Sequence, residues 1–200
     1  MEGETRGGSQ IVTKQFEQQT DPLNESDFAC VWKVLRAFPS PGGLAFYNCG
    51  DASGHSQPHK HVQVVPLPLS AAAAASSPAP LDALIFRAAA AAGCSGVEAV
   101  GSPFRVGSLP FQHVCCMLHR TDARVTASAL AQWCGGMRAT VTQTSESWNL
   151  VMTMDWMMMV PRSKDRTGSV ALKCAPDLRS CLCGTGRGSA TAGFGWAKEA

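Results

Sequence analysis

The feature that most constrains the fold is a pair of short strands joined by a loop rich in glycine and serine. Residues 44–49 form an apolar run that is typical of a buried strand. Residues 50–58 are polar and carry glycine, serine and proline, so they are expected to form a loop. Residues 59–65 alternate in character and end at Pro66, which predicts a second strand. The polar loop therefore lies directly between two strands.

Alternation decides which side chains of the second strand lie together. Successive side chains of a strand point to opposite faces, so His59, His61 and Gln63 share one face. Lys60 and Val62 share the other face. Neutral imidazole is a good nucleophile toward phosphorus, and loops of small residues expose N–H groups that hold phosphate oxygens. The combination indicates phosphoryl or nucleotidyl chemistry, although the spacing alone equally allows a metal site or a surface stripe of histidines.

The segment before this unit predicts a strand and then an amphipathic helix. Residues 9–16 read as a strand, and Asn24 is a suitable N-cap for a helix that ends at the prolines and glycines of residues 38–43. The apolar positions of that helix recur at i, i+3, i+4 and i+7, and they are Phe28, Val31, Trp32 and Leu35. These residues are expected in the core and have no chemical role.

Later in the chain, a short helix is expected over residues 121–133. Val125, Leu130 and Trp133 would form its packed side. Residues 70–80 are rich in alanine, serine and proline and are expected to form a flexible insert.

The composition is that of an ordinary globular protein with one domain. The 200 residues are 45% hydrophobic and 16% charged, with a formal net charge of +2. This balance demands neither a nucleic-acid partner nor a membrane partner. No apolar run approaches the roughly 20 residues that a membrane-spanning helix requires.

The cysteines indicate reduced thiols and no metal site. Their number is 9, which is odd, and no secretory signal precedes them, so reduced intracellular thiols and a cytoplasmic location are expected. Cys115 and Cys116 lie close to His113 and His119 in the sequence, and 181–183 contains another close pair of cysteines. Neither spacing matches a paired zinc knuckle, so we expect no metal ligands.

Residues 11–69 resemble the diadenosine tetraphosphate phosphorylases, also called ATP adenylyltransferases, a branch of the histidine-triad superfamily. The resemblance rests on residues 11–24, which look like the family's strand and turn into its helix, and on the signature at residues 46–63. In that signature this branch carries glutamine at the third place of the histidine triad, as Gln63 does here. Residues 109–113 and 148–162 are similar to a family strand near the site and to the family's late hairpin. The implied fold is α+β, with a histidine-triad-like antiparallel sheet and flanking helices.

The resemblance also implies a mechanism with a covalent intermediate. His61 would be the nucleophile, attacking the α-phosphorus of diadenosine tetraphosphate, releasing ATP and holding AMP until phosphate removes it as ADP. His59 would be the supporting histidine, and Gln63 would hydrogen-bond phosphate oxygens. The remaining substrate- and phosphate-binding residues that match the family are Asn48, Ser53, Gly54, Ser56, Gln57 and Asn149. His113 is expected to be a satisfied core residue, since it stands alone on an apolar strand.

The partners implied are dinucleoside polyphosphate, ATP, ADP and phosphate, with Mg2+ as an accompanying ion and no covalent cofactor. The expected organisation is a disordered N-terminus over residues 1–8, the nucleotidyltransferase domain over residues 9–166, and a disordered tail over residues 167–200. The domain is expected to be incomplete, because residues 1–8 have no counterpart to the family's N-terminal region. Three alternatives stay open: an impaired nucleotide-binding remnant, a dinucleoside polyphosphate hydrolase, and a metal-binding or purely structural α+β protein.

Overall fold

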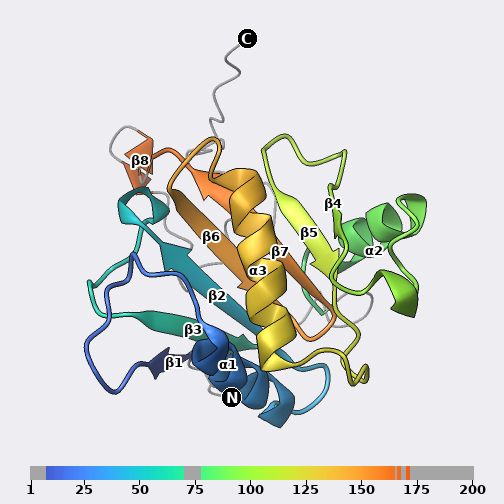
Figure 1. The fold of residues 1–200 in the computed structure, drawn as a ribbon, viewed down its shortest axis with the longest axis horizontal. Coiled ribbons are helices and arrows are strands. Elements are labelled where there is room, and N and C mark those ends of the chain that lie inside the picture. The colour runs from blue at the N-terminus through green and yellow to red at the C-terminus, as the bar shows by residue number, and fades with distance from the viewer. Residues whose placement is uncertain (1–7, 70–77, 165, 168–169, 172–200) are drawn as a thin grey trace, which may run out of the picture.

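An antiparallel sheet of seven strands forms the centre of the computed structural model (Figure 1). The structure describes residues 8–69, 78–164, 166–167 and 170–171. The order of the strands in the sheet is β1-β3-β2-β6-β7-β5-β4. Their bounds are Ser9–Val12 (β1), Gly43–Cys49 (β2), His61–Pro66 (β3), Pro103–Phe104 (β4), Val114–Met117 (β5), Ser147–Met152 (β6) and Trp156–Arg162 (β7). A separate short pair joins β8 (Arg166–Thr167) to β9 (Val170–Ala171).

The helix α1 (Glu25–Ala37) forms where the sequence predicts it. Asn24 accepts a hydrogen bond from the Asp27 N–H, and the Asp27 carboxylate accepts one from the Asn24 N–H, so the two form a capping box. All four apolar residues of the predicted stripe are buried against the sheet. The prediction of this helix is confirmed.

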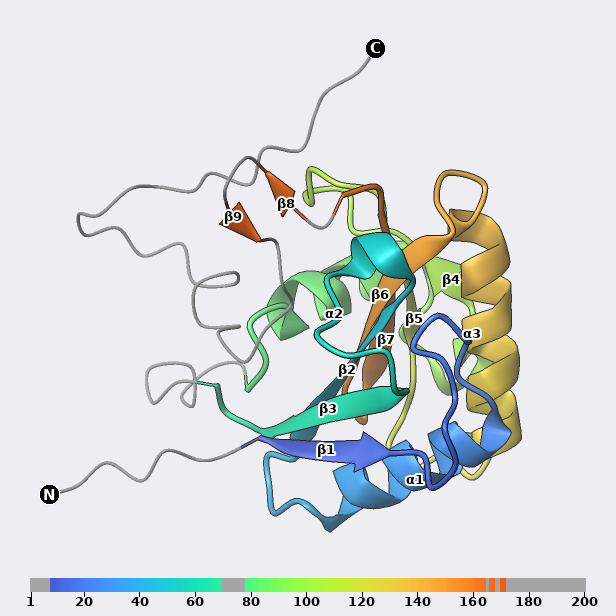
Figure 2. The same cartoon turned by 90° about the vertical axis from the view of Figure 1, so that its left-hand side faces the viewer.

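The helix α3 (Ala127–Val141) lies beside α1 on the same face of the sheet (Figure 2). The predicted range 121–133 was wrong at both ends. Thr126 accepts a hydrogen bond from the Ala129 N–H and starts the helix late, and the buried stripe continues past Trp133 through Cys134, Met137 and Val141. Packing of this buried stripe on the sheet stabilises the helix beyond Gly135 and Gly136, although glycine disfavours the interior of a helix.

The opposite face of the sheet is covered in part by α2 (Asp82–Ala91), as Figure 2 shows. Ile85 and Ala89 of this helix pack against Phe104, Cys115 and Met158 of the sheet in a second apolar cluster. Short 3-10 helices, Asp51–Ser53 (η1) and Val97–Ala99 (η3), complete the structure. Within the described residues, no helix has both the length and the apolar character needed to cross a bilayer.

Three predicted strand positions need correction. The first strand ends at Val12 rather than at residue 16, and β3 begins at His61 rather than at His59. Beyond Val12 the chain leaves β1 and meets residues 58–60 again through the bonds Lys60 N to Glu17 O and Gln19 N to Pro58 O. Residues 109–111 are bends, residues 112–113 have no regular structure, and the strand there starts at Val114.

The α+β fold with its antiparallel sheet is confirmed. The predicted domain boundaries and the incompleteness of the domain stay predictions. Most of the predicted insert, most of the N-terminal segment and most of the tail lie outside the described residues.

Candidate active site

A polar patch occupies one end of the sheet face that α2 partly covers. His61 and Gln63 come from β3, Asn48 from β2, Asn149 from β6 and Arg162 from β7, and these four strands are neighbours in the sheet. The register places Asn48 opposite Asn149 and Phe46 opposite Gln63, so their side chains share one face. The structure thus brings together side chains from positions 48 to 162.

The ring of His61 is held in one tautomer by the backbone. Its Nδ1 lies 2.9 Å from the carbonyl oxygen of His59, and a carbonyl only accepts, so Nδ1 carries the proton. Nε2 of the neutral ring then holds a lone pair. It faces the Gln63 side-chain amide at 3.4 Å, which is a long contact. The His61 side chain is buried, with 3% of its surface exposed. Among the described residues its Nε2 lone pair makes only this long contact, which suits it to nucleophilic attack.

The backbone of His61 is clamped by Gln19, a residue to which the sequence assigned no role. Its Oε1 accepts from the His61 N–H at 2.8 Å, and its Nε2 donates to the carbonyl oxygens of Asn48 at 2.8 Å and His61 at 3.3 Å. The side-chain amide therefore stands between β2 and β3 where their ladder of hydrogen bonds ends. Gln19 lies inside the segment that resembles the family, but no single-sequence pattern distinguishes it from Gln18.

His59 contributes through its backbone more than through its ring. Its carbonyl orients His61, whereas its ring Nε2 lies 3.0 Å from the Thr13 hydroxyl and 3.3 Å from the Gln15 carbonyl. The ring also packs against Phe16, with the ring centres 5.4 Å apart. The structure therefore places the predicted supporting histidine beside the segment after β1, two residues before β3 begins, in an isolated bridge with Gln18.

The loop between β2 and β3 carries the residues predicted to bind phosphate. Ser53 is fully buried, and its Oγ has no hydrogen-bond partner among the described residues. Gly54 adopts a left-handed conformation with φ of 80°, Ser56 is exposed and Gln57 is half-buried. Gly50, with φ of 86°, approaches Ser147 so closely that a Cβ would lie 2.5 Å from its Oγ. The loop therefore packs on β6 and leaves Ser56 open to solvent.

Asn48, Asn149 and Arg162 form a buried chain of hydrogen bonds across three strands. Asn149 Nδ2 donates to Asn48 Oδ1 at 2.6 Å and to the Ser53 carbonyl at 3.0 Å. Arg162 Nη1 donates to Asn149 Oδ1 at 2.8 Å. Arg162 is only 6% exposed, and the sequence did not lead us to expect it in the site. Side-chain alternation could have suggested it, because a charged residue ends an otherwise apolar strand.

Lys60 lies on the reverse face of the histidine strand and is almost fully buried. Its Nζ pairs with Asp27 of α1 at 2.6 Å and with Glu17 at 2.9 Å. Burial lowers the pKa of Lys60, but the hydrogen bonds to Asp27 and Glu17 outweigh burial and leave that pKa above its ordinary value. These two ion pairs hold α1 and Glu17 against the strand that carries His61.

His113 and the nearby cysteines do not form a second site. His113 donates from Nδ1 to Phe111 O at 2.8 Å and accepts at Nε2 from the Val106 N–H at 2.8 Å, which makes it the satisfied core residue that was expected. Cys115 and Cys116 belong to different apolar clusters on opposite faces of β5. Burial raises the pKa of the Cys115 thiol to about 12, so it stays protonated. Cys181 and Cys183 lie outside the described residues.

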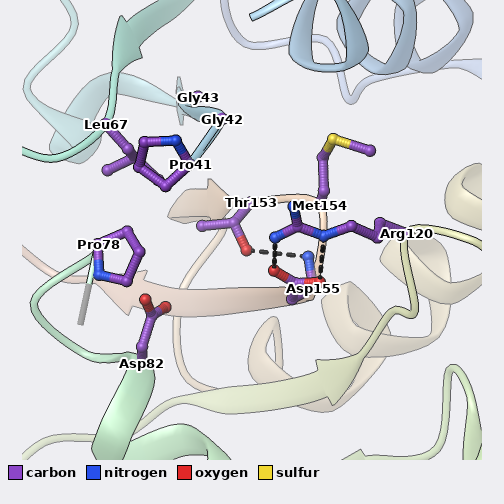
Figure 3. A pocket seen from close by; sticks show the side chains of 10 residues that line it. All are labelled: Pro41, Gly42, Gly43, Leu67, Pro78, Asp82, Arg120, Thr153, Met154 and Asp155. Atoms are coloured by element: carbon purple, nitrogen blue, oxygen red, sulfur yellow. Dashed lines mark hydrogen bonds and ion pairs between the residues drawn. The ribbon is translucent and has the colours of Figure 1, made fainter. Parts of the chain in front are cut away.

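A small hollow lies beside the β6–β7 turn and the start of β2 (Figure 3). This end of the sheet is opposite to the end that carries His61. Its volume is about 20 Å3, room for a single water molecule. The charged groups around it are already paired: Arg120 binds Asp155, and Asp82 accepts from Trp156 Nε1 at 2.7 Å and from the Ala79 N–H at 2.9 Å. This hollow is therefore a packed structural junction.

Comparison with known proteins identifies the family to which the chain is similar. Two family models match the chain, the Ap4A phosphorylase N-terminal domain over residues 9–87 and the ATP adenylyltransferase C-terminal domain over residues 107–185. Protein APA1 of Saccharomyces cerevisiae is 26% identical over 174 residues, which cover 77% of this chain and 50% of that protein. Diadenosine 5',5'''-P1,P4-tetraphosphate phosphorylase 2 of the same yeast is 25% identical over 184 residues, covering 80% of this chain and 52% of that protein. The chain thus spans about half the length of these curated relatives.

The fold is also similar to solved structures. The crystal structure of yeast Ap4A phosphorylase Apa2 in complex with AMP is 26% identical, with a TM-score of 0.63, and the match covers 82% of this chain and 55% of that chain. A second crystal structure of Apa2 gives a TM-score of 0.60 at 26% identity, covering 82% of this chain and 54% of that chain. The match in fold therefore extends over most of this chain.

Proposed function

Because this chain belongs to the Ap4A phosphorylase family, we propose that it is a nucleotidyltransferase that cleaves diadenosine tetraphosphate with phosphate to give ATP and ADP, and that it runs the reverse reaction. The observation that carries the proposal is the tautomer of His61. Its Nδ1 is committed to the His59 carbonyl, which leaves the Nε2 lone pair directed toward the polar patch.

The reaction proceeds in two displacements at phosphorus. In the first, Nε2 of His61 attacks the α-phosphorus, the bond from that phosphorus to the bridging oxygen breaks, and ATP leaves with the bridging oxygen. His61 then carries AMP on Nε2, and its Nδ1 proton stays hydrogen-bonded to the His59 carbonyl, which stabilises the positive charge on the ring. In the second displacement, phosphate attacks the same phosphorus, the N–P bond breaks, and ADP leaves.

The other residues supply contacts to the phosphates and the nucleotide. Ser53, with a buried hydroxyl that has no hydrogen-bond partner among the described residues, is the strongest candidate for a phosphate contact. Gly54, Ser56 and Gln57 line the same loop and offer backbone and side-chain donors. Gln63 stands next to Nε2 and donates to the transferred phosphoryl group without giving up a proton.

Asn48 and Asn149 complete the floor of the site as nucleotide contacts, and His59 acts as support through its carbonyl. Mg2+ accompanies the polyphosphate in this proposal, because it neutralises the charge of the phosphate groups. The cytoplasm is the proposed compartment. The free, buried thiols of Cys49 and Cys134 support it, because thiols stay reduced there.

The proposal is tested by following labelled phosphate. The purified chain is mixed with diadenosine tetraphosphate, Mg2+ and 32P-phosphate, and the nucleotides are separated. The expected product is ADP that carries the label at its β-phosphate, made together with unlabelled ATP and absent with His61→Ala. Formation of AMP and ATP without any need for phosphate would identify a hydrolase instead. No turnover by a folded chain would reduce the function to nucleotide binding.

A further inference from the structure

We propose that Arg162 is a positioning residue that sets the direction of the hydrogen bonds between Asn149 and Asn48, so that Asn48 presents a donor to the nucleotide. This inference rests on the proposed function and deepens it. Its starting point is the buried chain that runs from Arg162 on β7 through Asn149 on β6 to Asn48 on β2.

The direction of this chain follows from the chemistry of arginine. A guanidinium group has donors only and stays charged at every pH of interest. The atom of Asn149 that lies 2.8 Å from Arg162 Nη1 must therefore be the carbonyl oxygen, Oδ1. The NH2 group of Asn149 is then directed the other way, where both of its hydrogens are used, one by Asn48 Oδ1 at 2.6 Å and one by the Ser53 carbonyl at 3.0 Å.

The orientation of Asn149 in turn fixes the orientation of the Asn48 amide. Its Oδ1 is occupied by Asn149, so its Nδ2 turns away from Asn149 and donates from the face of the sheet that carries His61 and Gln63. An isolated asparagine can rotate its amide and offer either atom. With Arg162 in place, Asn48 can offer only the donor without breaking a buried hydrogen bond.

A donor is the useful atom at this place. The oxygens of a phosphate group accept hydrogen bonds and donate none when ionised, and an amide oxygen facing them would repel them. Arg162 is itself placed by Nη2, which donates to the Lys164 carbonyl at 3.0 Å, and by the Ser145 hydroxyl, which donates to the Arg162 carbonyl. Its action on the nucleotide therefore passes through two asparagines.

Three variants separate this role from a merely structural one. Arg162→Lys keeps a donor-only group beside Asn149, so the direction of the chain is kept. Arg162→Met removes the donor and lets both amides rotate. Asn149→Asp keeps a partner for Arg162 and so keeps a buried charge paired, but a carboxylate accepts only, and Asn48 must then turn its NH2 inward and its oxygen toward the nucleotide. Arg120→Met is the matched control, because it removes an arginine from the distant Arg120–Asp155 pair.

The experiment measures the rate of AMP transfer to His61 from diadenosine tetraphosphate without phosphate, together with AMP affinity by calorimetry. We expect a fall of about 10- to 100-fold in rate and affinity for Arg162→Met, the value of one hydrogen bond to a charged group. Arg162→Lys should recover most of the loss, Asn149→Asp should fall at least as far as Arg162→Met, and Arg120→Met should match the unmodified chain. Because the Ser53 carbonyl also loses its donor in Asn149→Asp, urea unfolding checks that this variant is folded.

Two results would overturn the inference: Asn149→Asp that transfers and binds AMP like the unmodified chain, or Arg162→Lys that is as impaired as Arg162→Met. Failure of the proposed function looks different, since the unmodified chain itself would then carry no adduct. In that case the AMP affinities of the variants, compared with that of the unmodified chain, test the role of Arg162. An unmodified chain that binds no AMP overturns both proposals.

Discussion

Two buried histidines, His61 and His113, have nearly the same surroundings on one side of the ring. Each has 3% of its surface exposed, and each donates from Nδ1 to the carbonyl of the residue two positions earlier, at 2.9 Å for His61 and 2.8 Å for His113. They differ at Nε2. In His113 this nitrogen accepts the Val106 N–H at 2.8 Å, whereas in His61 it meets only the Gln63 amide at 3.4 Å.

In the proposed mechanism, this difference separates a structural histidine, His113, from the nucleophile, His61. The Nδ1 bond fixes the tautomer in both rings, so it cannot by itself indicate catalysis. What matters is whether the lone pair on Nε2 is already used by the protein. In His113 a backbone donor uses it. In His61 the lone pair makes only the long contact with Gln63 within the described part of the chain, and we propose that it attacks phosphorus.

The largest expected effect is that of His61→Ala. Removing the nucleophile eliminates the covalent route, so turnover of diadenosine tetraphosphate should fall about a thousandfold or more. Steady-state kinetics measures the loss, and urea unfolding shows whether the variant is folded. A folded His61→Ala chain with more than a tenth of the original turnover would contradict the assignment.

Gln19→Leu should have the next largest effect. The change removes the acceptor for the His61 N–H and the donor for two buried carbonyls, at about 1–3 kcal/mol for each group left unsatisfied. A shift of the nucleophile should lower kcat by about 10- to 100-fold, with a smaller change in KM. Gln18→Leu, at the exposed neighbouring position, is the control and should keep full kcat. Equal kcat in the two variants would show that Gln19 does not position His61.

His113→Leu should affect stability and leave the chemistry intact. The buried Val106 N–H loses its acceptor, so the free energy of unfolding should fall by about 1–3 kcal/mol. Turnover per folded molecule should stay within about twofold of the unmodified chain, since a substitution away from the site removes no transition-state contact. A loss of turnover comparable to that of His61→Ala would erase the contrast between the two histidines.

The smallest expected effect is a dependence of stability on pH. Burial lowers the pKa of His113 below its ordinary value of 6.5, although its hydrogen bond to Phe111 raises it in part. The unfolded chain therefore binds the proton at a higher pH than the folded chain does. The stabilisation of the folded chain by neutral His113 is present above about pH 6.5 and is lost as pH falls through the folded pKa. The free energy of unfolding then changes by at most about 1.4 kcal/mol per pH unit. Urea unfolding at about pH 7 and about pH 5 should show a smaller loss for His113→Leu than for the unmodified chain. Equal losses in the two chains would contradict this role.

Local signals in the sequence were sufficient for several elements of the fold. The cap at Asn24 and the stripe from Phe28 to Leu35 predicted α1 because both signals lie within the helix itself. The helix α3 was harder, since Gly135 and Gly136 favour an end and only packing of Met137 and Val141 on the sheet overrides them. The end of β1 at Val12 depends on contacts of residues 17–19 with residues 58–60, which no local pattern reveals.

The site likewise contains residues that the sequence could identify and residues that it could not. Alternation and the resemblance to the family identified His61, Gln63, Asn48 and Asn149, and the structure places all four on one face of the sheet. Their predicted roles stay predictions. The residues that hold them, Gln19 and the guanidinium of Arg162, act across 42 and 13 positions of the chain, so their contacts appear only once the strands are paired.

The central claim is that Nε2 of His61 is the nucleophile that carries AMP. Its most direct test is the intact mass of the purified chain after mixing with diadenosine tetraphosphate in the absence of phosphate, with His61→Ala and His113→Leu alongside. The account predicts one AMP adduct on the unmodified chain and on His113→Leu, none on His61→Ala, and loss of the adduct as ADP when phosphate is added. A folded, unmodified chain that forms no adduct, or a His61→Ala chain that forms one, would contradict it.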